Sequence, residues 1–387
     1  MVKRFIAVIL CCVVLTGCYD RKELNKIGIV LAVALDKDTS TNEVVLYCEI
    51  VKPYVLKSSG ATGSGAGGTP TKIVMSKGYT VYDAIRNMSR KLDRKAFFSH
   101  NKIIIISEKL AREGVSPVLD AFMRDPEIRP LVWVAVAKGV KVSSILTSNH
   151  GIDQIQAAYI NDMIKTRWAT SEIQMLNILE FYKKLIKEGS NPTTGVMGIT
   201  KENSSEEIAL LGTAVFKKDK LIGYLNYKES RGLNWITNHV DSGIINIQGN
   251  SKTNNMIAVQ IIGSTSKIVP KIKGNNITFN IQIRENSEVG EVQDSTNIYD
   301  LKDISKLEDE EKEVIKGEIE RALDKAKYDF HTDIFGFGNS LSRYYPREWK
   351  KMKKDWNKLF LNAKYDVNIK VKLKRAGQIQ KPFKAKE

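Results

Sequence analysis

Few residues in this 387-residue sequence have the types and spacing that chemistry needs. The four histidines are His100, His150, His239 and His331. None lies at ligand spacing from another or beside a cysteine cluster, as a structural zinc site requires. Ser99 and His100 are adjacent, so their side chains would point to opposite faces of a strand. The sequence contains no HExxH, GxSxG or P-loop motif. We therefore predict no metal, no cofactor and no enzymatic activity.

Two further patterns are better explained by exposed structure than by chemistry. Residues 63–68 match GxGxxG formally, but Pro70 and an extended stretch follow where a dinucleotide site needs a helix. We therefore predict a flexible surface loop over residues 58–70. The adjacent Glu310 and Glu311 lie on a highly charged helical stretch. There we expect both carboxylates to be solvated.

The clearest chemistry belongs to Cys18. A short basic start precedes ten apolar residues, 5–14, a run too short to span a bilayer but typical of a signal peptide. Residues 15–18, LTGC, resemble the lipobox of bacterial lipoproteins: an aliphatic residue, two small residues and a cysteine. We predict a signal peptide at residues 1–17, cleavage between Gly17 and Cys18, and S-diacylglyceryl and N-acyl groups on Cys18. Two or more acyl chains anchor a protein stably in membrane lipid.

Cleavage would leave Cys48 as the one thiol of the mature chain, because Cys11 and Cys12 belong to the signal peptide. One thiol cannot form an internal disulfide. Cys48 lies on the apolar face of a predicted strand, 44–51, so we expect a buried small hydrophobic residue.

The net charge is +16, or +14 once Lys3 and Arg4 are removed with the signal peptide. Residues 285–333 hold 16 acids and 7 bases, whereas residues 334–387 hold 15 bases and 4 acids. Two explanations stay open: solvated faces that compensate each other after folding, or a basic face turned toward anionic lipid. The final strand offers bases without the interleaved aromatic residues of an RNA-binding sheet, so we predict no nucleic-acid partner.

The predicted elements divide the chain in two. In the first half, hydrophobic periodicity predicts strands at 27–35, 44–51, 102–106 and 131–137, and helices at 80–92, 108–113, 117–124, 142–147 and 152–187. In the second half it predicts strands at 209–216, 221–225, 244–247, 256–264, 266–272, 276–283 and 365–373, and helices at about 304–330 and 347–360.

This order of elements predicts an α+β protein: multi-domain, with mixed sheets and packed helices. We expect an N-terminal domain over residues 18–200, as one or two subdomains, and a C-terminal α+β domain over residues 201–387. In the C-terminal domain we expect an antiparallel sheet covered by two helices.

Several short motifs occur in a specific order along the chain. They are CYDRKELN at 18–25, Ser99-His100 before the strand at 102–106, RDPEIRP at 124–130, GTAVF at 212–216, ESRGLNW at 229–235, DIFGFG at 333–338, PREWK at 346–350 and Trp356. Together they resemble the landmarks of the Ger(x)C lipoprotein family, the C subunit of the bacterial spore nutrient germinant receptor. The resemblance covers nearly the whole chain.

The landmark residues have two interpretations, structural or in contact with a partner protein. The residues concerned are Asp125, Pro126, Arg129, Arg231, Gly232, Phe335, Gly336, Phe337 and Gly338. Prolines at 126 and 130 predict a rigid turn. The glycines of DIFGFG suit a turn that needs positive φ or close packing, with the two phenylalanines in core pockets.

The resemblance implies a non-enzymatic lipoprotein on the outer face of the spore inner membrane. It would work with two integral membrane proteins, the A and B subunits, one of which resembles an amino-acid transporter. Together they would sense small nutrients and start germination.

Two other functions remain open alternatives. A solute-binding lipoprotein of a transporter would need two α/β lobes around a ligand cleft. A secreted hydrolase would need a nucleophile–base pair, and the sequence offers none.

Overall fold

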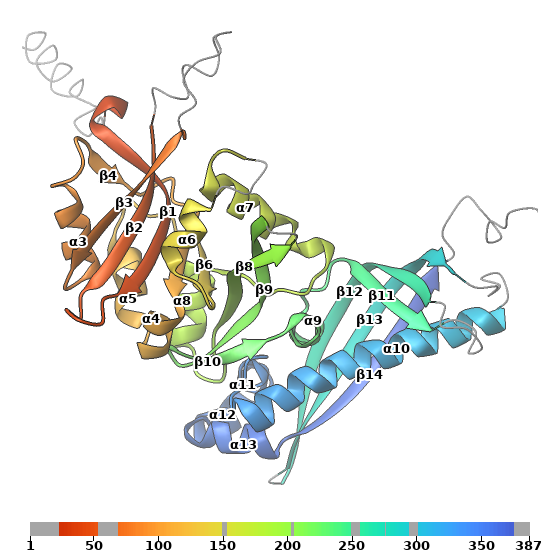
Figure 1. Cartoon of the computed structure of the whole chain (residues 1–387). Helices are drawn as coiled ribbons and strands as arrows, with labels where there is room; N and C mark the ends of the chain where they lie inside the picture. Colours follow the sequence, from red (N-terminus) through yellow and green to blue (C-terminus); the bar gives the residue numbers. More distant parts are fainter. Residues whose placement is uncertain are drawn as a thin grey trace, which may run out of the picture.

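The computed structural model describes residues 23–52, 69–148, 153–202, 205–248, 256–274, 276–293 and 301–374. The predicted signal peptide, Cys18, most of the loop at 58–70 and His150 lie outside these residues. The described chain forms one sheet of ten strands and one of four, each packed against helices (Figure 1). The predicted α+β class is therefore confirmed. No described helix is long and apolar enough to cross a membrane.

The first sheet has the strand order β10-β9-β8-β6-β5-β1-β2-β3, with β4 beside β1 and β7 beside β6. The strands are β1 (Ile27–Lys37), β2 (Val44–Val51), β3 (Thr71–Gly78), β4 (Lys95–Phe97), β5 (Ile103–Ser107), β6 (Trp133–Ala137), β7 (Leu176–Asn177), β8 (Thr193–Glu202), β9 (Ser205–Lys217) and β10 (Lys220–Leu225). Its centre, β1-β5-β6-β8, is parallel, and β4 also pairs with β1 in parallel. The other strands, β2, β3, β7, β9 and β10, pair antiparallel with their neighbours. All five residues of β5 are buried, as expected of a parallel strand covered on both faces.

Helices cover both faces of the first sheet. One face packs against α3 (Val81–Met88), α4 (Glu108–Glu113), α5 (Ser116–Arg124) and α8 (Ile178–Ile186). The other face packs against α6 (Val142–Thr147) and α7 (Gln156–Thr166). Local signals explain several of their ends. The Thr80 hydroxyl accepts a hydrogen bond from the Asp83 amide at 3.1 Å and caps α3. Gly114 ends α4 at φ 136°.

The predicted burial of Cys48 is confirmed. The residue is fully buried in the core under α3 and α5. Burial raises the pKa of the Cys48 thiol far above its ordinary value, which keeps the thiol protonated.

The helices predicted over residues 152–187 are interrupted, contrary to our expectation. A 3₁₀ turn, Arg167–Ala169, follows α7, and no helix resumes until α8. Ser171 turns the chain at φ 53°, and its hydroxyl donates to the carbonyl of Ser242 at 2.7 Å. The Gln174 amide donates to the Thr213 hydroxyl at 3.1 Å. These contacts come from distant parts of the chain, so local periodicity could not indicate them.

The second sheet has the order β11 (Gly243–Gln248), β12 (Met256–Lys273), β13 (Asn276–Val292) and β14 (Lys364–Lys374). The first three strands are antiparallel, as predicted. β14 lies parallel to β13, so the expectation of a fully antiparallel sheet was wrong. The physical reason is the connection: the chain returns through helices to the starting end of β13, and such a crossover produces a parallel pair.

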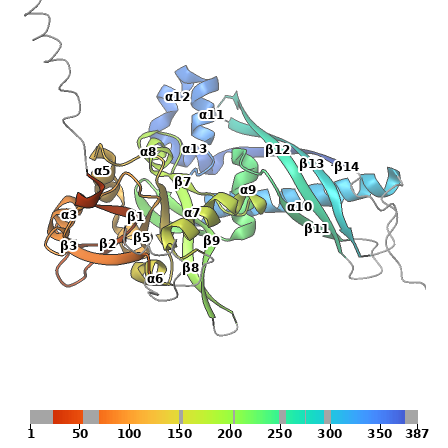
Figure 2. The ribbon, with the colours of Figure 1, turned by 90° about the horizontal axis from the view of Figure 1, so that it is seen from above.

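Helices lie on one face of the second sheet. They are α9 (Tyr227–Thr237), α10 (Leu301–Asp324), α11 (Phe337–Tyr344), α12 (Pro346–Met352) and α13 (Trp356–Asn362), with a π turn (Lys325–Asp329) after α10 and a 3₁₀ turn (Lys353–Asp355) between α12 and α13. More helices than the two predicted therefore cover this sheet. α10 runs along the strands, and α9 stands between the two sheets (Figures 1 and 2).

The hairpin predicted at 209–216 and 221–225 does not join the second sheet. Its strands, β9 and β10, extend the first sheet through β8. The change from one sheet to the other occurs at α9, after Leu225. Strand periodicity cannot show which sheet a hairpin joins, because that choice depends on long-range pairing.

Candidate functional site

The DIFGFG motif forms a loop around the carboxylate of Asp333. The carboxylate accepts hydrogen bonds from the amides of Phe335, Gly336 and Gly338 at 2.9–3.0 Å and from the Trp356 indole at 3.2 Å. Burial raises the pKa of Asp333 to about 6, against the opposing effect of the amides. Gly336 has φ 83°, which favours glycine. The buried Asp333 carboxylate therefore holds the backbone of its own loop in place.

The aromatic side chains beside this loop form one buried cluster. Phe337 packs against Phe279, Phe335 and Tyr365 with ring centroids 4.7–5.2 Å apart. Trp349 and Trp356 meet edge to face at 5.3 Å, and both are nearly buried. The landmark phenylalanines thus pack between the sheet and the last helices.

The ESRGLNW motif forms most of α9 and holds it against α10. The Arg231 guanidinium donates twice to the Glu318 carboxylate, at 2.8 and 2.5 Å, and once to the carbonyl of Ile244 at 3.1 Å. The Trp235 indole donates to the same carboxylate at 3.0 Å. Arg231 and Glu318 are 5% and 1% exposed. The motif therefore supplies a buried, bidentate ion pair.

Two landmark glycines permit close backbone contacts. A Cβ atom at Gly232 would collide with the carbonyl oxygen of Glu318, so α9 and α10 approach closely there. A Cβ atom at Gly338 would collide with the backbone of Gly189, in the segment that leads into β8. The contact at Gly338 therefore joins the DIFGFG loop to the first half of the chain.

A second buried acidic site lies under α10 and was not anticipated. Glu311, which we expected to be solvated, is fully buried and faces Glu285 of β13. The Ser287 hydroxyl donates to Glu311 at 2.8 Å. Burial and the neighbouring carboxylate raise the pKa of Glu285, and burial raises that of Glu311. A signal existed in the sequence: Glu311 lies four residues before Ile315 on the apolar stripe of α10.

We expect this pair to make stability fall as the pH rises. Because the folded pKa values are raised above about 4.3, the folded state holds more protons than the unfolded state, so stability is greatest at low pH. The free energy of unfolding of the wild type should fall by roughly 1 kcal/mol per pH unit from pH 6 to pH 9. Glu285→Gln, which stays neutral, should flatten this slope. Urea unfolding at each pH measures both.

The control is Glu310→Gln, at the neighbouring residue, which forms an ion pair with Lys306 at 3.7 Å. It should keep the pH slope of the wild type. A Glu285→Gln variant with the same slope as the Glu310→Gln control would contradict the shared-proton explanation.

The RDPEIRP landmark lies on the surface. The Asp125 carboxylate accepts from the Glu127 amide at 2.9 Å, and the Ser99 hydroxyl donates to the Glu127 carbonyl at 2.7 Å. These bonds fix the turn, yet the side chains of Pro126 and Arg129 are exposed. Ser99, the neighbour of His100, is thus engaged with backbone and not with a histidine.

This turn ends in an exposed apolar residue. Leu131 is 68% exposed, a high value for a large aliphatic side chain. Arg129 makes no hydrogen bond or ion pair with other described residues. We call Pro126, Arg129 and Leu131 the landmark surface. Packing explains the buried landmarks, whereas the side chains of Arg129 and Leu131 are exposed.

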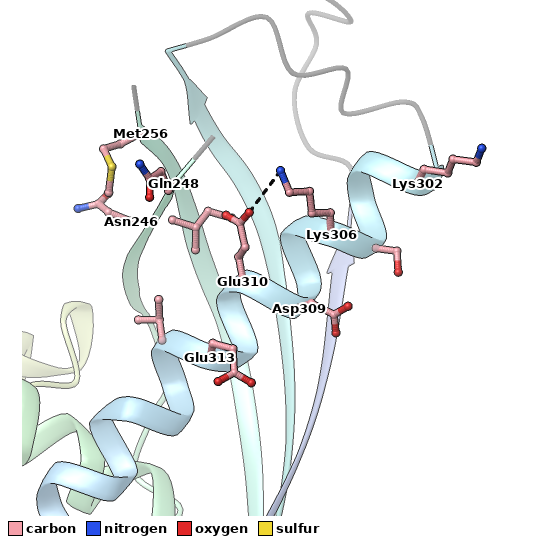
Figure 3. A pocket seen from close by; sticks show the side chains of 11 residues that line it. Asn246, Gln248, Met256, Lys302, Lys306, Asp309, Glu310 and Glu313 are labelled. Carbon is pink, nitrogen blue, oxygen red and sulfur yellow. Dashed lines mark ion pairs between the residues drawn. The ribbon is translucent and has the colours of Figure 1, made fainter. Parts of the chain in front are cut away.

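A groove of about 1100 Å³ lies between the free edge of β11 and the first half of α10. Figure 3 shows Lys306 and Glu310 of α10 joined by their ion pair, with Gln248 and Met256 on the strands opposite. Its lining contains no histidine or cysteine. No group of histidine, cysteine and acidic residues in the described part of the chain could hold a metal ion.

The predicted lipidation site cannot be compared with this geometry. Gly17 and Cys18 lie outside the described residues, which begin at Glu23.

Comparison with known proteins gives consistent matches along the chain. The family model of the spore germination protein N-terminal domain matches residues 20–199, and that of the spore germination B3/GerAC-like C-terminal domain matches residues 211–377. The chain is 30% identical to spore germination protein KC of Bacillus subtilis (strain 168), over 98% of this chain and 97% of that protein. It is 23% identical to spore germination protein B3 of the same organism, over 92% and 94%.

A solved structure shares the fold. The crystal structure of the GerBC protein matches with a TM-score of 0.55 and 18% identity, and the alignment covers 88% of this chain and 96% of that one.

Proposed function

This chain belongs to the GerAC family of spore germination proteins, the C subunits of germinant receptors, and from this premise we propose that it is a lipid-anchored, non-enzymatic receptor subunit. Cys18 would carry the lipid, on the outer face of the spore inner membrane. The integral membrane A and B subunits would be its partners. Its domains would be residues 18–200 and 201–387, with strands of the first sheet crossing that division.

The observation that carries the proposed partner contact is the contrast among the landmarks. Arg231, Gly232, Phe337 and Gly338 are buried and hold the fold together. The landmark surface, Pro126, Arg129 and Leu131, is exposed on a fixed turn. Arginine is enriched at protein interfaces, and Leu131 adds exposed apolar area beside it. We therefore place the contact with the membrane subunits there.

The test is co-purification of the membrane subunits with this chain from detergent-solubilised spore membranes. The double variant Arg129→Glu/Leu131→Asp should reduce recovery of the membrane subunits at least tenfold, because it removes the apolar contact and reverses the charge. Its free energy of unfolding should stay within about 0.5 kcal/mol of that of the wild type, since both side chains are exposed.

The matched control is Tyr328→Asp/Arg347→Glu. Tyr328 is 66% exposed and Arg347 is exposed, both in the second half of the chain. This control should retain the membrane subunits. Equal recovery with both double variants would contradict a contact at the landmark surface.

The alternative, solute binding, has one feature in its favour. A hollow of about 670 Å³ lies where the two halves meet, lined by Lys184, Lys187, His239 and Arg343 among others. Burial lowers the pKa of Lys184 to about 8. Tight binding of a small carboxylate to the isolated chain, without partner subunits, would favour this function.

A further inference from the structure

The outer face of the second sheet carries an array of cations. Side chains alternate along a strand, and paired residues share a face. In β13, the residues from Ile277 to Val289 at odd positions are buried against the helices, so the even positions face outward. Register then places eight bases on the outer face. They are Lys267, Lys271 and Lys273 of β12, Arg284 of β13, and Lys364, Lys370, Lys372 and Lys374 of β14. We call these eight the basic face.

The basic face is exposed and free of helices. All eight side chains are exposed. The described helices α9 to α13 pack on the opposite, apolar face, through residues such as Phe279, Ile281 and Ile283. In Figure 1, α10 lies along one face of the four strands. The face with the lysines is therefore available to a partner.

These cations are not neutralised within the described chain. None of the eight forms an ion pair or a side-chain hydrogen bond with another described residue, and the acids on the same face are Glu288, Glu291 and Asp366. The lysines of α10 behave differently: Lys306, Lys312 and Lys316 each lie within 4.0 Å of a carboxylate of their own helix. These three lysines of the acidic helix are therefore paired within it, whereas the bases of the basic face have no ionic partner among the described residues.

We propose that the basic face lies against the anionic lipid headgroups of the membrane. The composition of the basic face favours lipid over an acidic protein as the partner. Seven of the eight cations are lysines, and no aromatic residue stands among them, whereas protein interfaces are depleted in lysine and enriched in aromatic residues. Lysine is a hydrated point charge, suited to a diffuse anionic surface.

The dimensions agree with contact over several lipids. β14 has 11 residues, which span about 36 Å at the usual rise of a strand. Cations must come within about 8 Å, one Debye length at physiological salt, to feel the lipid charge. From Cys18 to Glu23 the backbone can reach about 18 Å at most, so a lipid on Cys18 would keep the fold near the membrane. The basic face would then set the orientation of the fold relative to the membrane.

The experiment measures co-sedimentation of the unlipidated chain, residues 19–387, with lipid vesicles. This chain contains every described residue and lacks the anchor, so the result does not depend on lipidation or on the partner contact proposed above. The vesicles are phosphatidylcholine alone, or phosphatidylcholine with 30% phosphatidylglycerol, at about 0.1 M salt. We expect binding to the anionic vesicles and not to the neutral ones.

The triple variant Arg284→Glu/Lys370→Glu/Lys372→Glu reverses three neighbouring charges on β13 and β14. It should weaken binding to anionic vesicles at least tenfold. The matched control, Lys141→Glu/Lys183→Glu/Lys228→Glu, reverses three exposed lysines that make no ion pair with described residues and lie outside the second sheet. It should change binding less than twofold. The bases beyond Lys374 are identical in all three proteins.

Three outcomes would overturn the proposal. These are equal binding by the triple variant and the wild type, equal binding to neutral and anionic vesicles, or no vesicle binding together with retention on immobilised polyglutamate. The last would identify an acidic protein as the partner. Circular dichroism confirms that each variant is folded before it is compared.

Discussion

Replacing Arg231 with alanine should destabilise the chain by about 3–5 kcal/mol. The reason is the carboxylate left behind. Glu318 is 1% exposed and is held by two bonds from Arg231 and one from Trp235. Without the guanidinium, a buried negative charge would lack its counter-ion, and α9 would lose its polar contact with α10. Because α9 stands between the two sheets, both halves of the chain would be affected.

Urea unfolding of the mature, unlipidated chain measures this effect. The matched control is Arg112→Ala, which removes an arginine from an exposed pair with Glu108 at 2.7 Å on α4. Such a pair contributes about 0.3–0.5 kcal/mol, so the control should be nearly neutral. A second variant, Arg231→Met/Glu318→Met, removes both charges and should recover most of the lost stability. Equal effects of Arg231→Ala and Arg112→Ala would show that the buried pair is not what holds α9.

Replacing Cys18 with alanine should release the chain from membranes. Without the thiol no diacylglyceryl group can be attached, and each buried CH₂ of an acyl chain contributes about 0.8 kcal/mol of membrane affinity. We expect the membrane fraction to fall at least tenfold and incorporation of labelled fatty acid to disappear. Membranes should be washed in 1 M salt, where the Debye length of about 3 Å removes electrostatic attraction by the basic face.

Cys48→Ala serves as the control for the anchor. Its thiol is buried in the core under α3 and α5, so the variant should lose a little stability. It should keep its lipid and stay in the membrane fraction. Retention of Cys18→Ala at the wild-type level in salt-washed membranes would contradict the anchor.

The sequence predicted the local elements well where local chemistry decides them. The strand at 44–51 and the helices at 108–113 and 142–147 have the predicted bounds. In each of these segments, the spacing of the apolar residues has the period of the strand or helix that forms. The helix that Thr80 begins is also where capping predicted it. Predictions failed at residues 152–187, because Ser171 and Gln174 bond to residues 39 to 71 positions away.

The candidate sites show the same division. Motif order along the sequence was enough to suggest the family, which the comparisons establish. The motifs alone could not separate Arg231, which is buried in an ion pair, from Arg129, which is exposed. Both are arginines beside small or rigid residues. Their difference lies in whether a carboxylate from a distant helix reaches them.

Taken alone, the sequence determined the family, the α+β class and the local helices and strands, because these follow from residue order and from periodicities of two to four residues. The tertiary structure decided three further features: which strands pair, which acids are buried and which cations stay free. β14 lies parallel to β13, Glu311 faces Glu285, and eight bases gather on one uncovered face. The physical reason is the same for all three: each depends on pairing and burial between residues far apart in the chain.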